Sequence, residues 1–192
     1  MHGGDPSRYR SRADLDRLLG GAERPPRDQG RVTLLVVRGP AESRANPGAV
    51  SLTVDRPLPG DRWSKERDPE RKSQITAMEH GIGVAIANGQ DLSLFGDNLV
   101  LDLALDAGNL PIGSLVRVGN ALLEVTPEPH TGCKKYAQRF GVDALAWISA
   151  RERKSLRLRG IHFRVVEPGR VAVGDPVDVV RRGDGIQTSL AF

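Results

Sequence analysis

The chain has 192 residues, an apolar content of 39% and a formal net charge of +4. This length suits one domain, and the chain has no apolar run of about 18 residues, so we expect no membrane-spanning helix. The N-terminus lacks an apolar stretch of signal-peptide length. A single cysteine excludes an intramolecular disulfide and zinc sites of the Cys-x-x-Cys kind. These features predict a protein of the reducing cytoplasm.

Positive charge is concentrated in the third of the chain that also holds the cysteine. Residues 130–182 contain twelve lysine and arginine residues against five acids, which gives about +7 and leaves about −3 for the rest. A basic surface attracts phosphate-bearing partners, whether these are a cofactor or a nucleic acid.

The first thirty residues are polar and predict an extension that contains one short helix. Ser11 is a suitable N-cap residue, and Leu15, Leu18 and Leu19 fall on one face of the helix that would follow. We expect this helix to dock on the domain and the rest of the extension to be mobile.

The next part of the chain predicts two strands, a loop and a strand–helix pair. Residues 32–37 (VTLLVV) are β-branched and continuous, which is typical of a strand buried on both faces. Residues 50–54 alternate as a half-buried strand does, and residues 61–72 are densely charged and indicate a long loop. The apolar spacing in residues 75–87 favours a short strand that leads into a helix.

The second half of the chain predicts six short strands around a helical segment. The strands are expected at residues 98–103, 114–119, 121–126, 161–166, 170–173 and 177–180. Gly119-Asn120 indicates a tight hairpin, and Gly141 divides the helical segment after Cys133 into two short helices. Many short strands with Gly/Pro turns and few helices predict a mainly β fold, a closed or nearly closed β-barrel.

The segment around the lone cysteine is the most informative part of the sequence for chemistry. Gly132 lets the backbone turn sharply just before Cys133, which would lie near the N-terminus of a helix. The helix dipole, together with Lys134 and Lys135, would favour the thiolate, the form that attacks sulfur or ligates a soft metal. His130, three residues earlier, is a candidate proton donor or hydrogen-bond partner.

Each of these features also has a purely structural interpretation. A lone cysteine is often an inert buried residue. Tyr136, Phe140 and Trp147, at helical spacing, are more typical of core residues than of cofactor stackers. The basic run at residues 151–160 is more typical of a solvated face than of a binding strip.

Five motifs in order give the chain a resemblance to the MOSC family, named for the C-terminal domain of molybdenum cofactor sulfurase. They are Leu58 to Trp63 (LPGDRW), Phe95 to Leu101 (FGDNLVL), Leu110 to Gly119 (LPIGSLVRVG), Leu123 to Lys135 (LEVTPEPHTGCKK) and Arg159 to Val179 (RGIHFRVVEPGRVAVGDPVDV). We assign residues 31–182 to this MOSC-like domain, which leaves an extension at residues 1–30 and a tail at residues 183–192. The resemblance implies a MOSC-type closed β-barrel with a few short helices.

The resemblance also implies roles for individual residues. Cys133 is similar to the family cysteine, which carries sulfur as a persulfide or coordinates molybdenum in a pterin cofactor. The other residues implied at the cofactor are Asp61, Arg62, Asn98, Thr131, Gly132, Lys134 and Arg164. His130 stands beside Cys133 as the second candidate for a catalytic role.

The implied activity is reduction of N-hydroxylated compounds with molybdenum cofactor (molybdopterin) and with electrons from outside the chain. The segment lacks the aminotransferase-like and ferredoxin-like domains of larger family members, so it resembles a standalone, bacterial-type member that needs an external electron or sulfur donor protein. Cofactor-binding members often have an N-terminal β-domain that contacts the phosphate, whereas here 30 polar residues precede the core. Pyridoxal phosphate binding is a further association of the family as a whole.

Two alternatives to the molybdenum enzyme remain open from the sequence. A sulfur carrier would form a persulfide on Cys133, for sulfuration of a cofactor or a metal–sulfur cluster, and would bind no molybdenum; a chain with one cysteine has no second thiol to resolve that persulfide. A barrel that binds nucleic acid through residues 151–159 is ranked last, because an aromatic content of 4% offers few side chains for base stacking.

Overall fold

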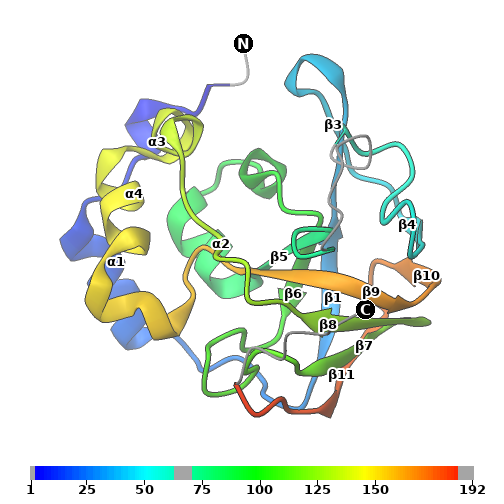
Figure 1. The fold of residues 1–192 in the computed structure, drawn as a ribbon. Helices are drawn as coiled ribbons and strands as arrows, with labels where there is room; N and C mark the ends of the chain where they lie inside the picture. The colour runs from blue at the N-terminus through cyan, green and yellow to red at the C-terminus, as the bar shows by residue number, and fades with distance from the viewer. Residues whose placement is uncertain (1–2, 63–70, 186–192) are drawn as a thin grey trace.

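The structure is a computed structural model in which residues 3–62 and 71–185 are described, and it confirms the closed β-barrel. The barrel strands, in spatial order, are β1 (Gln29–Leu35), β11 (Pro176–Arg181), β7 (Leu115–Val118), β8 (Ala121–Val125), β9 (Ile161–Glu167), β5 (Ile75–Glu79) and β6 (Leu99–Asp102), and β6 closes onto β1. Neighbouring strands are antiparallel except β5 and β6, which are parallel. Figure 1 shows the barrel beside a group of helices.

Two small sheets lie outside the barrel. β4 (Ala49–Leu52) pairs with β10 (Gly169–Ala172). β2 (Val37–Arg38) pairs with β3 (Arg44–Ala45) to form a hairpin, and the short 3₁₀ turn η2 (Pro40–Glu42) lies at its tip.

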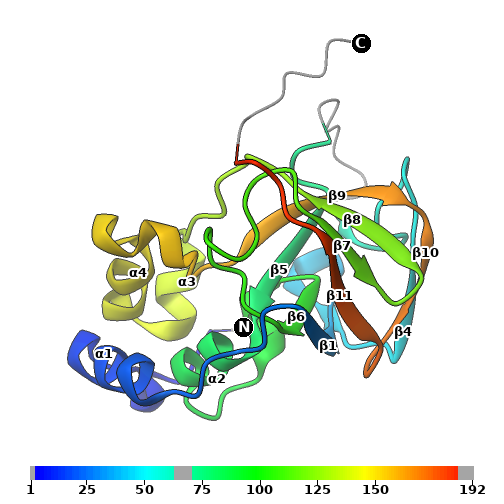
Figure 2. The same cartoon turned by 90° about the horizontal axis from the view of Figure 1, so that it is seen from below.

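The helices gather on one side of the barrel (Figure 2). They are α1 (Arg12–Gly21), α2 (His80–Ala87), α3 (Lys134–Phe140) and α4 (Val142–Ser149), with the 3₁₀ turns η1 (Pro6–Arg8), η4 (Leu92–Phe95) and η5 (Arg151–Leu156). Apolar side chains from this layer and from the barrel strands β5 and β6 form a second core around Leu15, Met78, Phe140 and Trp147, which are all fully buried. Tyr136, Phe140 and Trp147 are thus core residues, as their spacing predicts.

The barrel interior is filled by the inward-facing residues of its strands. In β7, Val116 and Val118 are buried while Leu115 and Arg117 are partly exposed, the alternation expected for a strand with one face on the core. The hairpin at Gly119-Asn120 is confirmed, since Val118 pairs with Ala121 across it.

One sequence-based boundary needs correction. The strand predicted at residues 32–37 is interrupted: β1 ends at Leu35 and β2 begins at Val37. At the interruption, Val36 bonds to Asn98 through both its N–H and its C=O, after which the chain leaves the barrel for the hairpin. The predicted loop at residues 61–72 is described only at its ends, because residues 63–70 lie outside the described residues, as do residues 186–192 of the predicted tail.

The N-terminal helix forms and docks as predicted. The Ser11 hydroxyl accepts a hydrogen bond from the Asp14 N–H at 3.1 Å, and Leu15 is buried against α2 and α4. Within residues 3–62 and 71–185, no helix is long and apolar enough to cross a membrane.

Replacing Ser11 with alanine should cost about 1 kcal/mol of stability, because the Asp14 N–H loses its capping acceptor. Urea unfolding measures this loss. The control is Ser155→Ala, because Ser155 is exposed. Thr53→Ala is unsuitable as a control, because the Thr53 hydroxyl bonds to Arg56. Equal stability of Ser11→Ala and the wild type would contradict the role given to this cap.

Candidate functional site

Cys133 lies at the end of the loop that connects β8 to α3. It is exposed and occupies the N-cap position of α3. Before it, Gly132 lies against α4: a Cβ added to Gly132 would come within 2.4 Å of Leu145 Cδ1 and 3.0 Å of Ile148 Cδ1. Glycine therefore allows a close approach to α4 that a larger residue would reach only by displacing these side-chain ends.

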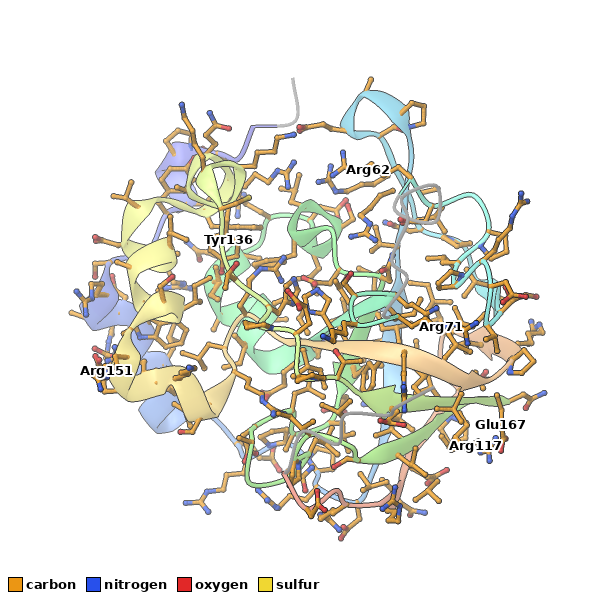
Figure 3. All side chains as sticks on the ribbon, viewed as in Figure 1. Arg62, Arg71, Arg117, Tyr136, Arg151 and Glu167 are labelled. Atoms are coloured by element: carbon orange, nitrogen blue, oxygen red, sulfur yellow. The ribbon has the colours of Figure 1, made fainter. Side chains whose placement is uncertain are left out.

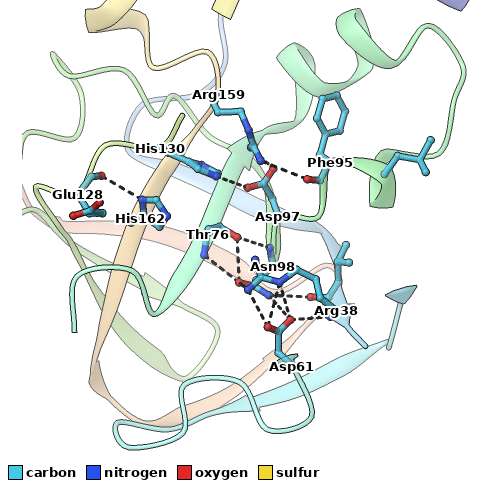
Figure 4. A network of polar contacts seen from close by, with 12 residues as sticks. Arg38, Asp61, Thr76, Phe95, Asp97, Asn98, Glu128, His130, Arg159 and His162 are labelled. Atoms are coloured by element: carbon cyan, nitrogen blue, oxygen red, sulfur yellow. Dashed lines mark hydrogen bonds and ion pairs between the residues drawn. The ribbon is translucent and has the colours of Figure 1, made fainter. Parts of the chain in front are cut away.

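Behind this loop, a buried polar group, here called the Asp97 cluster, consists of Asp97, His130, Tyr136, Arg159 and His162. Arg159 Nη1 donates to Asp97 Oδ2 at 2.5 Å, and His130 Nε2 lies 3.5 Å from Asp97 Oδ1. The Arg159 guanidinium also lies over the Tyr136 ring, 5.5 Å from its centre. Figure 4 shows that Asp97 lies between the side chains of Arg159 and His130. The cluster thus ties the cysteine loop to the segment before β6.

Burial keeps the two histidines of the cluster neutral. Their rings are 4.6 Å apart, and His162 Nδ1 lies 3.2 Å from the Glu128 carbonyl oxygen, which can only accept, so Nδ1 of His162 carries the proton. Burial lowers the pKa of His130 well below 6.5, with Arg159 adding to the effect, and burial also lowers the pKa of His162. His130 is therefore a neutral group held against Asp97 rather than a charged acid.

Four buried atoms of the Asp97 cluster have no hydrogen-bond partner among the described residues. They are Asp97 Oδ1, His130 Nδ1, Tyr136 Oη and Arg159 Nε. An unpaired buried polar group costs about 1–3 kcal/mol, so native proteins usually satisfy such groups with protein, water or ligand. Unpaired donors and acceptors in one place indicate a polar site.

A second network lies beside the first and is fully paired. Arg38 donates to both carboxylate oxygens of Asp61, at 2.9 to 3.2 Å, and to Asn98 Oδ1 at 3.1 Å. The Asn98 amide nitrogen donates to Val36 O and to Asp61 Oδ2, and Thr76 donates its N–H to Asn98 Oδ1 (Figure 4). This network fixes Arg38 at the base of the β2–β3 hairpin.

Four arginines, here called the arginine cluster, gather between the hairpin and α3: Arg38, Arg44, Arg62 and Arg139. Burial lowers the pKa of Arg44, and Arg139, Arg62 and Arg38 add to the effect, while Glu42 opposes it. The buried Nε of Arg44 has no hydrogen-bond partner in the part of the chain that the structure describes. A Cβ added to Gly96 would lie 3.5 Å from Arg44 Nη2 and 3.8 Å from Arg38 Cδ, so the cluster adjoins the segment that carries Asp97.

The structure separates the sequence-predicted site residues into three groups. Cys133, Thr131 and Lys134 are exposed on the loop and the start of α3, with His130 and Gly132 between the loop and the protein interior. Asp61 and Asn98 are buried in the paired network with Arg38, and Arg62 is exposed in the arginine cluster. Arg164 lies apart from both and pairs with Glu124 at 2.8 Å across β8 and β9.

Sequence reasoning missed the residues that join these groups, namely Arg38, Glu42, Arg44, Asp97, Arg139 and Arg159. The basic run at residues 151–160 is not simply a solvated face: Arg159 pairs with Asp97, Arg157 donates to Leu110 O, and Arg153 pairs with Asp16. No local pattern signals this, because the alternation of apolar and basic residues at 156–159 (LRLR) would place the arginines on the solvent face.

Comparison with known proteins agrees with this fold. A family model described as MOSC domain matches residues 71–178. The Bacillus subtilis (strain 168) protein YflK is 33% identical over 98 residues, a match that covers 50% of this chain and 42% of YflK, less than half of that protein's length. Among solved structures, YiiM from Geobacillus stearothermophilus has a TM-score of 0.60 at 20% identity, with 81% of this chain and 77% of that chain covered. YuaD from Bacillus subtilis has a TM-score of 0.57 at 16% identity, with 78% and 94% covered.

Proposed function

The chain belongs to the MOSC domain family, and from this premise we propose that it binds a molybdenum cofactor of the pterin type. Cys133 would be the ligand of the metal, and the arginine cluster would face the phosphate. One observation carries the proposal: the only thiol of the chain is exposed at the start of the helix whose Arg139 reaches the arginine cluster.

The residues present fit such a group in their chemistry. A sulfur ligand suits a soft metal, and guanidinium groups suit a phosphate. A pterin has both donor and acceptor edges, and the unpaired buried atoms next to the loop include an acceptor, Asp97 Oδ1, and donors from Arg159 and Tyr136. The proposal thus accounts for polar atoms that the protein itself leaves unsatisfied.

The proposed reaction is reduction of an N-hydroxylated compound. It takes two electrons and two protons, breaks the N–O bond and releases water; the electrons come from a separate reductase protein. When bound, a molybdenum pterin supplies the two-electron redox chemistry for this conversion. The chain's own part is to hold the loop in place: His130 packs with its Nε2 3.5 Å from Asp97 Oδ1, and Gly132 lets the loop approach α4.

An alternative role is that of a sulfur carrier, favoured by the exposure of Cys133. A persulfide on this sulfur would be open to an acceptor protein, and a chain with one cysteine has no internal thiol to discharge it. The third role, nucleic-acid binding through residues 151–159, loses support because Arg153, Arg157 and Arg159 are engaged in internal contacts. The proposed compartment of the protein is the reducing cytoplasm, because the Cys133 thiol must stay reduced.

Elemental analysis and intact mass of freshly purified protein test these roles together. Cells are grown with added molybdate, and wild type is compared with Cys133→Ser and with Gln138→Ala, an exposed residue of α3 that serves as the control. We expect molybdenum in the wild type and in Gln138→Ala, and its loss in Cys133→Ser.

A wild type that contains no molybdenum but gains the mass of one sulfur atom, lost in Cys133→Ser, would replace the enzyme with the sulfur carrier. Protein that is both metal-free and unmodified under several growth conditions would contradict both roles. Equal molybdenum in Cys133→Ser and wild type would remove Cys133 from the site.

A further inference from the structure

A carboxylate already lies in the cationic region where the hairpin meets α3. Glu42, at the tip of the β2–β3 hairpin, accepts a hydrogen bond from Arg139 Nη2 at 2.9 Å and another from Lys135 Nζ. Both partners belong to α3, the helix that begins at Cys133. The hairpin is therefore fastened to the helix of the cysteine through one side chain.

The backbone that presents Glu42 is in an uncommon conformation. Ala41 has φ 50° and Glu42 has φ 61°, both in the left-handed region that non-glycine residues seldom adopt. Such residues cost on the order of 1 kcal/mol each and persist where the surroundings hold them. The contacts of Glu42 with Lys135 and Arg139 are what hold this turn against α3.

Positive charge exceeds negative charge around this carboxylate. Among residues 3–62 and 71–185, five cations (Arg38, Arg44, Arg62, Lys135 and Arg139) face two carboxylates (Glu42 and Asp61), which gives these seven side chains a formal charge of +3. Asp61 is committed to Arg38. Within residues 3–62 and 71–185, no carboxylate lies within ion-pair distance of Arg44 or Arg62, and the buried Nε of Arg44 has no acceptor.

We propose that this region is a phosphate site in which Glu42 is an internal stand-in for the anion. A phosphate group would bind to Arg44 and Arg139 and take over the contacts of the Glu42 carboxylate, which would then move away with the hairpin tip. The idea rests on the proposed function in so far as the phosphate is that of the pterin cofactor. The exchange would make hairpin opening a condition for tight binding.

The alternative is that Glu42 only pins the hairpin to α3. The two roles make opposite predictions for Glu42→Gln, which keeps the size and an acceptor oxygen but removes the charge. If Glu42 only attaches the hairpin to α3, Glu42→Gln should leave the affinity for phosphate unchanged or lower it, because the arginines would be less well held. If the Glu42 carboxylate occupies the place of the phosphate, Glu42→Gln should raise the affinity for phosphate, because the competing anion is gone.

The test measures the binding of inorganic phosphate to the full chain by isothermal titration calorimetry at constant ionic strength. Variants are Glu42→Gln, the double variant Glu42→Gln/Arg44→Gln, and Glu167→Gln. Glu167 serves as the charge-matched control because it pairs with Arg117 in another part of the barrel, away from Arg62 (Figure 3). We expect Glu42→Gln to bind phosphate about tenfold more tightly than wild type, the effect of removing one competing charge-assisted contact. The double variant should lose this gain, and Glu167→Gln should match wild type.

An unchanged or weaker affinity of Glu42→Gln would overturn the proposal, as would an equal gain in Glu167→Gln, which would show a general charge effect. Glu42→Ala serves as a second variant if Glu42→Gln does not fold. Phosphate titration needs neither metal nor thiol, so it is repeated in Cys133→Ser. If Glu42→Gln binds phosphate more tightly but the wild type contains no molybdenum, the phosphate site stands and the cofactor is rejected. If the wild type contains molybdenum but Glu42→Gln binds phosphate no more tightly, only the exchange of Glu42 for phosphate is rejected.

Discussion

Replacing Arg159 with methionine should lower the free energy of unfolding by about 3–5 kcal/mol, the usual cost of breaking a buried ion pair from one side. Asp97 is fully buried, and the Arg159 side chain is 11% exposed. Methionine keeps much of the packing against Tyr136 but leaves the Asp97 carboxylate without its cation. Chemical denaturation, monitored by tryptophan fluorescence and circular dichroism, measures the loss.

Two further variants identify the cause. Asp97→Asn in the Arg159→Met background removes the stranded charge and should recover a large part of the stability. Arg117→Met breaks the pair with Glu167, whose side chain is 54% exposed, and should cost no more than about 1 kcal/mol. If Arg159→Met costs no more than Arg117→Met, the Asp97 cluster does not depend on this ion pair.

The prediction also extends to the cysteine loop, because Asp97 lies between Arg159 and His130. In Arg159→Met the loop should be less well fixed, and Cys133 should be alkylated by iodoacetamide at a different rate from wild type even where both are fully folded. Equal alkylation rates would confine the role of Arg159 to stability.

The fold was predictable because local patterns determine most of it. The alternation in residues 114–119, the turn at Gly119-Asn120 and the break at Gly141 are each visible within a few residues, and each appears in the structure. Ser11 and the leucines after it likewise predict α1 and its docking face. Burial and hydrogen bonding within neighbouring residues decide these elements, so one sequence is enough.

The partners of the site residues were not predictable, since they lie far away in the chain. The resemblance assigns Asp61 and Asn98 to the cofactor, and in the structure both accept hydrogen bonds from Arg38, which is 23 and 60 residues away. Arg159 finds Asp97 over a separation of 62 residues. No periodicity indicates which arginine meets which carboxylate. The assignments of Cys133, His130, Thr131 and Lys134 remain predictions that the experiments above address.

Glu79→Gln should stabilise the protein at alkaline pH and have little effect in acid. Burial raises the pKa of Glu79 from 4.5 to about 7, and the nearby carboxylates of Asp106 and Asp102 add to the rise. The folded protein therefore holds a proton on Glu79 between about pH 4.5 and 7 that the unfolded chain has released. Its contribution to stability is greatest in acid and is lost as the pH rises through the folded pKa.

The expected size follows from the shift. Above pH 8, the charged Glu79 should cost about 3 kcal/mol relative to a neutral group of the same shape, and the difference should fall below about 1 kcal/mol at pH 5. Glu79 is the N-cap residue of α2, where a negative charge gains about 0.3–1 kcal/mol from the helix dipole, too little to offset this cost. Glutamine thus removes a penalty that grows with pH.

The measurement is urea unfolding of wild type and Glu79→Gln at several pH values from 5 to 9. The histidines of the Asp97 cluster, whose pKa values burial lowers, make the folded state less stable as the pH falls below about 6.5. They act equally in both proteins, so the difference between the two curves isolates Glu79. The control is Glu152→Gln, whose side chain is 65% exposed and whose difference from wild type should not vary with pH. If the difference in unfolding free energy between Glu79→Gln and wild type also does not vary with pH, Glu79 is ionised in the folded state at all these pH values. Burial and the acidic neighbours would then not hold its proton.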